Sequence, residues 1–204
     1  FQKIDSEMPY PLLILSGLLA WQFFSQVLSD AGGSLVGNAH VLTKIYFPRI
    51  ILPISASLSA LLDLGISIML FVVLALYFGV DLSFNMFLVL FFVVQIYFLA
   101  LGLGLFVAAF NVKYRDFGHI VGLFLRLGFF ISPVGYALSI IPPKYLDVYI
   151  LNPMVGLING FRWSLLGESF YLKAWLISMG ITVLSVFLGL YFFRKTEAGF
   201  ADNV

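Results

Sequence analysis

Five long apolar stretches restrict this chain to folds that cross a lipid bilayer. They occupy residues 9–28, 50–78, 86–110, 117–141 and 174–193. A helix needs about 20 mainly apolar residues to cross the roughly 30 Å of hydrocarbon in a bilayer. Only 10% of the 204 residues are charged, whereas a soluble domain carries about 25%. Too few charges remain to cover a water-facing surface.

The five stretches are predicted to be helices, because a helix satisfies its own backbone hydrogen bonds in lipid. A transmembrane barrel would instead show alternating segments of about ten residues, and the sequence has no such alternation. No long repeat or low-complexity segment divides the chain. We therefore predict an all-α, polytopic membrane protein with about five transmembrane helices, forming one domain over residues 1–204.

A further apolar piece, residues 154–166, is too short to cross a membrane and directly follows Pro153. A proline ends a preceding helix, and non-helical backbone at membrane depth must face protein or water. This piece is therefore predicted to be a re-entrant or interfacial helix.

The basic residues near the ends of the stretches predict the orientation. One side would carry six of them and the other four: Lys44, Arg49, Lys113, Arg115, Arg194 and Lys195 against Lys3, Lys144, Arg162 and Lys173. Cytoplasmic loops carry the excess of Lys and Arg. We expect a cytoplasmic tail and a periplasmic N-terminus for this fragment, with one more span upstream in a full protein of six spans.

The sequence offers no catalytic constellation. His40 and His119 lie in different elements, and neither Ser132 nor Ser139 has an obvious histidine partner. There is no HExxH, Walker A or paired-carboxylate motif, and there are no cysteines. Metal and nucleophilic sites need several ligands or a positioned base. We expect no metal or cofactor in this chain; if ATP drives it, a separate subunit must hold the ATP and Mg²⁺.

The net charge of +1 gives no footprint for a nucleic acid.

Aromatic residues make up 18% of the chain, and two interpretations stay open for them. Aromatic residues at span ends anchor a helix at the membrane interface, which suits Tyr10, Tyr77, Tyr145 and Tyr191. Trp21, Phe23 and Phe24 fall inside a span. Such rings pack in the core or against lipid, or they line a path for sugars, whose C–H faces stack on aromatic faces.

Charged residues inside a membrane usually face a partner, water or a functional path. For Asp63 we favour a structural ion pair or a hydrogen bond between helices. For Arg126 a structural role and contact with a polar cargo or lipid phosphate stay equally open. Arg162 is expected to meet a phosphate or to cap carbonyl groups. Gly102 and Gly104 permit close contact between helices.

Four stretches carry a specific resemblance. They are NVKYRDFGHIVGLFLRLGFFISPVGY (111–136), LNPMVGLINGFRWSLLG (151–167), PYPLLILSGLLAWQFFSQVL (9–28) and SLVGNAHVLTKIYFPRIILP (34–53). In this order they cover nearly the whole chain, and together they resemble the permease subunit of bacterial ABC-2 polysaccharide exporters. Those exporters carry O-antigen, capsule or teichoic-acid chains, and the resemblance is greatest to the O-antigen branch.

The resemblance implies a subunit of the bacterial inner membrane that works as a homodimer with two ATP-binding subunits. Its cargo would be a polyprenyl-diphosphate-linked polysaccharide, moved from cytoplasm to periplasm. The fragment would lack the family's N-terminal interface helix and first span. Residues 37–47 match the family's coupling helix, which docks on the ATPase, although an interfacial loop helix is the alternative. The candidate coupling residues are Asn38, His40, Lys44 and Tyr46.

The resemblance also implies three further groups of site residues. An outer gate of short re-entrant helices would include Pro133, Asn152, Pro153, Phe161 and Arg162. The cytoplasmic mouth, where a pyrophosphate could bind, would include Lys113, Tyr114, Arg115, Asp116 and Arg126. The aromatic residues of a glycan channel would be Trp21, Phe24, Phe129, Phe130 and Tyr136. Two alternatives remain: an ABC-2 exporter of another cargo, such as a drug or lipid, and a membrane enzyme of lipid-linked sugars.

Overall fold

The computed structural model describes residues 9–42, 47–80, 84–114 and 117–197. Within these residues the chain is helical and contains no strand. The elements are α1 (Tyr10–Gly37), α2 (Ala39–Leu42), α3 (Ile51–Tyr77), the 3-10 turn η1 (Phe84–Leu88), α4 (Val89–Lys113), α5 (Phe117–Ile131), the 3-10 turn η2 (Leu138–Ile140), α6 (Pro143–Tyr149), α7 (Pro153–Leu166) and α8 (Leu172–Glu197). The predicted all-α membrane fold is confirmed.

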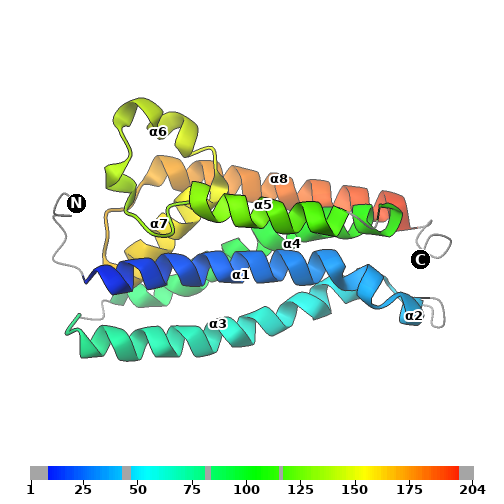
Figure 1. Cartoon of the computed structure of the whole chain (residues 1–204), viewed down its shortest axis with the longest axis horizontal. Helices are drawn as coiled ribbons and strands as arrows, with labels where there is room; N and C mark the ends of the chain where they lie inside the picture. The colour runs from blue at the N-terminus through cyan, green and yellow to red at the C-terminus, as the bar shows by residue number, and fades with distance from the viewer. Residues whose placement is uncertain (1–8, 43–46, 81–83, 115–116, 198–204) are drawn as a thin grey trace.

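Four helices are long and apolar enough to cross a bilayer in the described part of the chain: Tyr10–Gly37, Ile51–Tyr77, Asn85–Lys113 and Leu172–Glu197. α1 and α4 lie at the centre of the bundle, where α1 packs against α3 and α4, and α4 packs against α1 and α8 (Figure 1). α3 and α8 turn large apolar side chains outward. Such surfaces suit contact with lipid tails, which are as apolar as the side chains.

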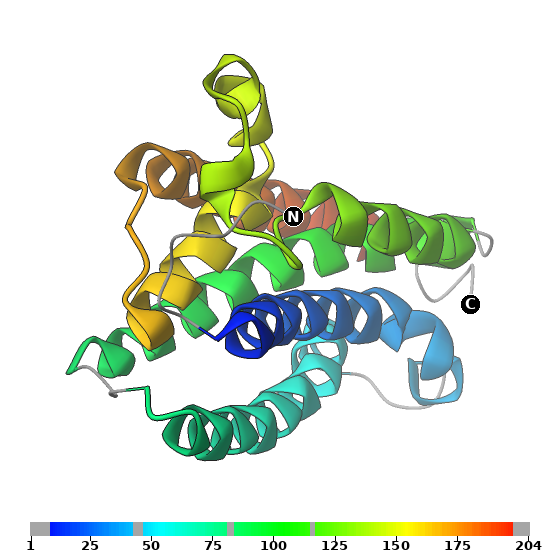
Figure 2. The same cartoon turned by 60° about the vertical axis from the view of Figure 1, so that its left-hand side comes forward.

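The two ends of the bundle carry different elements. α2, the start of α3 and the ends of α4 and α8 gather at one end, and α6 projects away from the bundle near the other end (Figures 1 and 2). α7 fills the space between α1, α4 and α8. This arrangement agrees with the predicted grouping of the loops; which end faces the cytoplasm stays a prediction.

Two predicted boundaries are wrong. The first span was expected to end at residue 28, but α1 continues to Gly37. Its extra turns are held by contact with α4, where Asn111 Nδ2 donates to the Gly32 carbonyl at 2.9 Å. The fourth span was expected over residues 117–141, but α5 ends at Ile131. A proline disfavours helical backbone at the residue before it, so Pro133 ends the helix. With 15 residues, α5 is about 22 Å long, which is short for a full crossing.

The interface between α4 and α8 depends on glycines. A Cβ atom at Gly102 would lie 2.6 Å from the Val186 nitrogen, and one at Gly189 would overlap the Gly102 carbonyl. On the other side of α4, a Cβ at Gly104 would lie 2.7 Å from Ala31 Cβ on α1. The predicted close contact at Gly102 and Gly104 is confirmed, and it is how α4 packs tightly against both neighbours.

A polar contact joins α1 to α3. Gln26 Nε2 donates to Asp63 Oδ2 at 2.7 Å. The prediction that Asp63 forms a hydrogen bond between helices is therefore confirmed.

Candidate functional site

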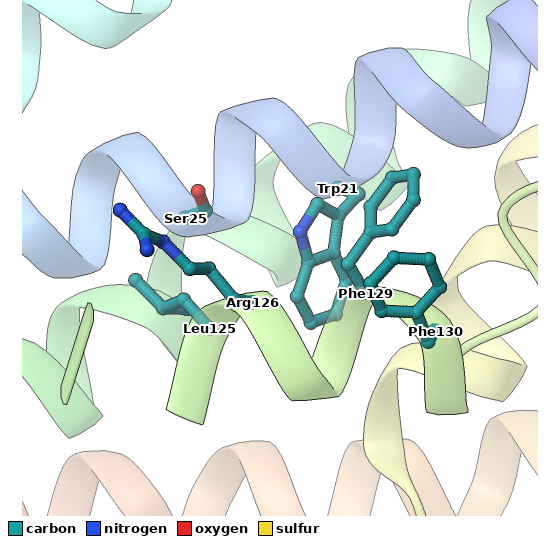
Figure 3. A pocket seen from close by; sticks show the side chains of 6 residues that line it. All are labelled: Trp21, Ser25, Leu125, Arg126, Phe129 and Phe130. Carbon is teal, nitrogen blue, oxygen red and sulfur yellow. The ribbon is translucent and has the colours of Figure 1, made fainter. Parts of the chain in front are cut away.

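A pocket of about 280 Å³ lies between α1 and α5 (Figure 3). Trp21 and Ser25 come from α1. They stand four residues apart, which places them on the same helix face. The lining from α5 is Leu125, Arg126, Phe129 and Phe130. The pocket thus joins two segments about a hundred residues apart in the sequence.

α5 lies at the surface of the bundle, and Leu125 is its only buried residue. Gly128 lets the helix approach α1: a Cβ atom there would lie 2.8 Å from Cη2 of Trp21. The indole therefore packs directly over the α5 backbone. This glycine and the pocket residues Ser25 and Leu125 were missed by the sequence analysis; Ser25 could have been found from its spacing to Trp21.

The aromatic rings of the pocket touch one another at large angles. The centroids of Trp21 and Phe129 lie 6.2 Å apart at 73°, and those of Phe129 and Phe130 lie 5.4 Å apart at 88°. Trp21 is only 7% exposed, while Phe130 is 76% exposed. The pocket therefore combines one fixed ring with one that faces outward.

Two predicted channel aromatics lie outside the pocket. Phe24 is buried behind Trp21, with ring centroids 5.5 Å apart. Tyr136 follows α5 and its hydroxyl lies 2.8 Å from that of Tyr149. Burial and this hydrogen bond raise the pKa of Tyr149 above its ordinary value. The Tyr136–Tyr149 pair ties the segment after α5 to α6.

Arg126 supplies the positive charge of the pocket. Its side chain is exposed, and among the described residues it forms no hydrogen bond or ion pair. It lies next to Ser25, near the middle of α1. α1 is long and apolar enough to cross a bilayer, and a charge beside such a helix needs water, an anion or a polar cargo next to it.

The other residues predicted at the cytoplasmic mouth are separate from Arg126. Lys113 ends α4, and its Nζ lies 5.3 Å from the ring centroid of Tyr114. Arg126 is nine residues into α5, about 13 Å along the helix from Phe117. Arg115 and Asp116 lie outside the described residues. The structure thus groups Arg126 with the pocket aromatics and leaves Lys113 and Tyr114 at the end of the bundle.

The predicted coupling segment is described only in part. Asn38 caps the end of α1, where its backbone nitrogen and Nδ2 both donate to the Ser34 carbonyl. His40 lies on the single turn α2 and is exposed. Lys44 and Tyr46 lie outside the described residues.

The predicted gate residues gather around α7. Pro133 is buried just after α5, and Pro153 is the first residue of α7. Phe161 and Arg162 are buried inside the bundle. α7 has 14 residues, nearly all buried, which fits a re-entrant helix rather than an interfacial one. Arg162 donates hydrogen bonds to carbonyl groups. Of the two roles expected for it, contact with a phosphate or with carbonyl groups, the structure shows the second.

Asn152 caps α7 in two directions. Its Oδ1 accepts from the Met154 nitrogen at 3.0 Å, and its Nδ2 donates to Ser132 Oγ at 3.0 Å. We expect Asn152→Ala to lower the free energy of unfolding by about 1 kcal/mol, the usual value of an N-cap. Asn152→Asp keeps the cap, and its second carboxylate oxygen can accept from the Ser132 hydroxyl in place of the lost Nδ2 donor, so thermal unfolding should show a smaller loss. Equal losses in the two variants would contradict the capping role.

Comparison with known proteins supports the membrane-transport interpretation. The sequence profile of the ABC-2 type transporter family matches residues 5–166. The O-antigen export system permease protein RfbA of Myxococcus xanthus is 34% identical over 157 residues, which cover 75% of this chain and 60% of the relative. A protein of the same name from Klebsiella pneumoniae is 26% identical over 195 residues, covering 95% of this chain and 75% of the relative.

The chain therefore spans between about 60% and 75% of the length of these relatives. The family profile covers well over half of the chain, and its match includes every pocket residue. This chain belongs to the ABC-2 type transporter family.

Proposed function

We propose that this chain is the transmembrane subunit of an ATP-driven exporter that moves a polyprenyl-diphosphate-linked polysaccharide of the O-antigen type from cytoplasm to periplasm. The family match and the names of the relatives support transport of this kind. The observation that carries the proposal is Arg126, a cation with no hydrogen-bond or ion-pair partner among the described residues, in an aromatic pocket beside α1, a helix long and apolar enough to cross a bilayer.

A lipid-linked glycan offers what this pocket can bind. The rings of Trp21, Phe129 and Phe130 provide rigid apolar faces for the C–H faces of sugars. The guanidinium of Arg126 presents a planar fork that matches phosphate oxygens. A sugar phosphate passing between α1 and α5 would meet both chemistries within one pocket.

The proposal requires partners that hold the energy source. The sequence has no Walker A motif, so two ATP-binding subunits would carry ATP and Mg²⁺, and a second copy of this chain would complete the path. The exposed turn with His40 is the proposed contact with the ATPase. Closure of the ATPase dimer would push on this lever and move α1 and α3 as rigid elements. The end of the bundle with α2 would then face the cytoplasm of a bacterial inner membrane.

Glycan localisation in cells that lack the gene tests the function. Export predicts that finished lipid-linked polymer accumulates on the cytoplasmic side, and that the native gene restores surface glycan. A partner ATPase with a disabled Walker A lysine should give the same accumulation. A block in polymer synthesis would contradict export and favour a membrane enzyme. Normal surface glycan in the deletion strain would exclude a glycan cargo.

A further inference from the structure

Non-helical backbone follows α5, and its carbonyl groups need partners. Three successive carbonyls receive side-chain donors: Val134 from Arg162 Nη2 at 2.7 Å, Gly135 from the Tyr10 hydroxyl at 3.3 Å, and Tyr136 from Arg162 Nη1 at 2.8 Å. Backbone freed from a helix at membrane depth is tolerated only when protein or water satisfies it. Arg162 supplies two of these three bonds.

The same guanidinium also binds α1. Arg162 Nη2 donates to the Leu13 carbonyl at 3.0 Å, and Nε donates to Ser16 Oγ at 3.3 Å. Gly17 leaves room for this contact, because a Cβ there would lie 2.6 Å from Nη2 and 2.5 Å from the Val134 carbonyl. Arg162 therefore bridges α7, which carries it, with α1 and the segment after α5.

This arginine is fully enclosed and bound to neutral acceptors. It is 1% exposed, and no carboxylate in the described part of the chain lies within ion-pair distance. Glu168 acts on it only from further away: burial raises the pKa of this carboxyl group, and the charge of Arg162 opposes the rise. A buried charge is expensive. A planar group with five donors spread over three nitrogens can reach carbonyls from several segments at once, whereas lysine has only three donors, all on one nitrogen.

The pocket continues the same ridge of α1. Leu13, Gly17, Trp21 and Ser25 follow one another at intervals of four residues, so they form one ridge of neighbouring positions that winds slowly around the helix. Arg162 binds at the level of the first two, and the pocket begins at Trp21. Phe129 and Phe130 end α5 a few residues before the bound carbonyls of Val134 and Tyr136. The position of these rings against Trp21 thus depends on how the end of α5 is held.

We propose that Arg162 is a positioning residue that fixes the end of α5 to α1 and α7, and so sets the geometry of the pocket. The effect on glycan export rests on the proposed function; the effect on the end of α5 does not. The inference assigns to this residue a task distinct from binding cargo, since its side chain is enclosed by protein.

Spin labelling of the full chain in lipid bilayers tests the fixing of α5. The sequence has no cysteine, so a label at Ile131→Cys, 59% exposed at the end of α5, reports without background. A label at Val183→Cys, 62% exposed on α8, is the matched reference. Arg162→Lys should raise the mobile population at residue 131 about tenfold, equivalent to about 1.4 kcal/mol, and leave residue 183 unchanged. An unchanged label at 131, or equal changes at both sites, would overturn the proposal.

Gly17→Ala gives a second test in which residue 162 is still arginine. Its new Cβ would overlap both the guanidinium and the Val134 carbonyl that the guanidinium binds, so the label at residue 131 should become mobile as it does in Arg162→Lys. Gly33→Ala on the same helix meets open space and should leave both labels unchanged. A rigid label at 131 in Gly17→Ala would refute the arrangement even if Arg162→Lys fails to fold.

Glycan export by the same variants separates the two proposals. Arg162→Lys should lower the rate of glycan export about tenfold, because a mobile α5 no longer holds Phe129 and Phe130 in place in the pocket. A mobile α5 with normal glycan export would overturn the link between Arg162 and the pocket. If Arg162→Lys makes α5 mobile but the native protein itself exports no glycan, the positioning role is supported and the proposed cargo is contradicted.

Discussion

Gly189→Val is expected to force α8 away from α4 and to lower the melting temperature of the purified protein by about 5 °C or more. A side chain at this position would overlap the Gly102 carbonyl, and the neighbouring atoms are the Gly102 carbonyl carbon at 2.9 Å and Cα at 3.2 Å. These are backbone atoms, so no side-chain rotation relieves the overlap. Overpacking of this kind costs about 1–3 kcal/mol, and helices in lipid associate mainly through such close packing.

Gly180→Val on the same helix is the matched control. No atom within 4 Å would meet a Cβ at Gly180, so this variant carries the helix propensity of valine without the overlap. Thermal unfolding in detergent, followed by circular dichroism, compares the two. Equal melting temperatures for the two variants would show that the contact between α4 and α8 is not tight.

The sequence was sufficient to predict this interface in outline. Gly102 and Gly104 stand in an uncharged stretch, and small residues in such stretches mark close helix contact. Their partners could not be predicted, because Gly102 meets α8 and Gly104 meets α1. Nothing in a single stretch indicates which neighbour lies on which side.

The end of α5 shows where hydropathy fails. Residues 132–141 contain no charged residue, so the apolar stretch was predicted to continue as one span to residue 141. Pro133 was the local signal against it, since Ser132 is disfavoured in helical backbone. The carbonyl groups freed where the helix ends are bound by Arg162, almost thirty residues later, whose guanidinium donates to the Val134 and Tyr136 carbonyls. Only the tertiary structure joins the two.

The candidate site was predicted in part for a similar reason. Trp21, Phe129, Phe130 and Arg126 were each named from the sequence, and the structure brings them to one pocket. Phe24 was named with them as an aromatic residue of the same stretch. Its side chain is buried behind Trp21 instead. The sequence identified the residue types, while the packing of α5 on α1 decided which of them line the pocket.

Arg126→Gln is expected to reduce glycan export about tenfold or more while the transporter still assembles. The substitution keeps a polar side chain but removes the charge, and hydrogen bonds to charged groups are worth about 1.5–3 kcal/mol. Arg126 has no hydrogen-bond or ion-pair partner among the described residues, so the substitution breaks no such bond there and folding should be unaffected. Arg126→Lys should retain part of the transport, because lysine offers a point charge without the planar fork.

Arg194→Gln provides the control for the loss of one positive charge, since Arg194 is exposed on the last turn of α8 and does not line the pocket. Surface glycan and co-purification of the ATPase subunit should both be measured for each variant. A cargo-binding role requires that Arg126→Gln loses glycan export and keeps the ATPase, while Arg194→Gln keeps both. If Arg126→Gln exports normally, the charge in the pocket serves a purpose other than binding the cargo. If it loses the ATPase as well, its role is in assembly, and the pocket loses the observation that makes it a site for a phosphate-linked cargo.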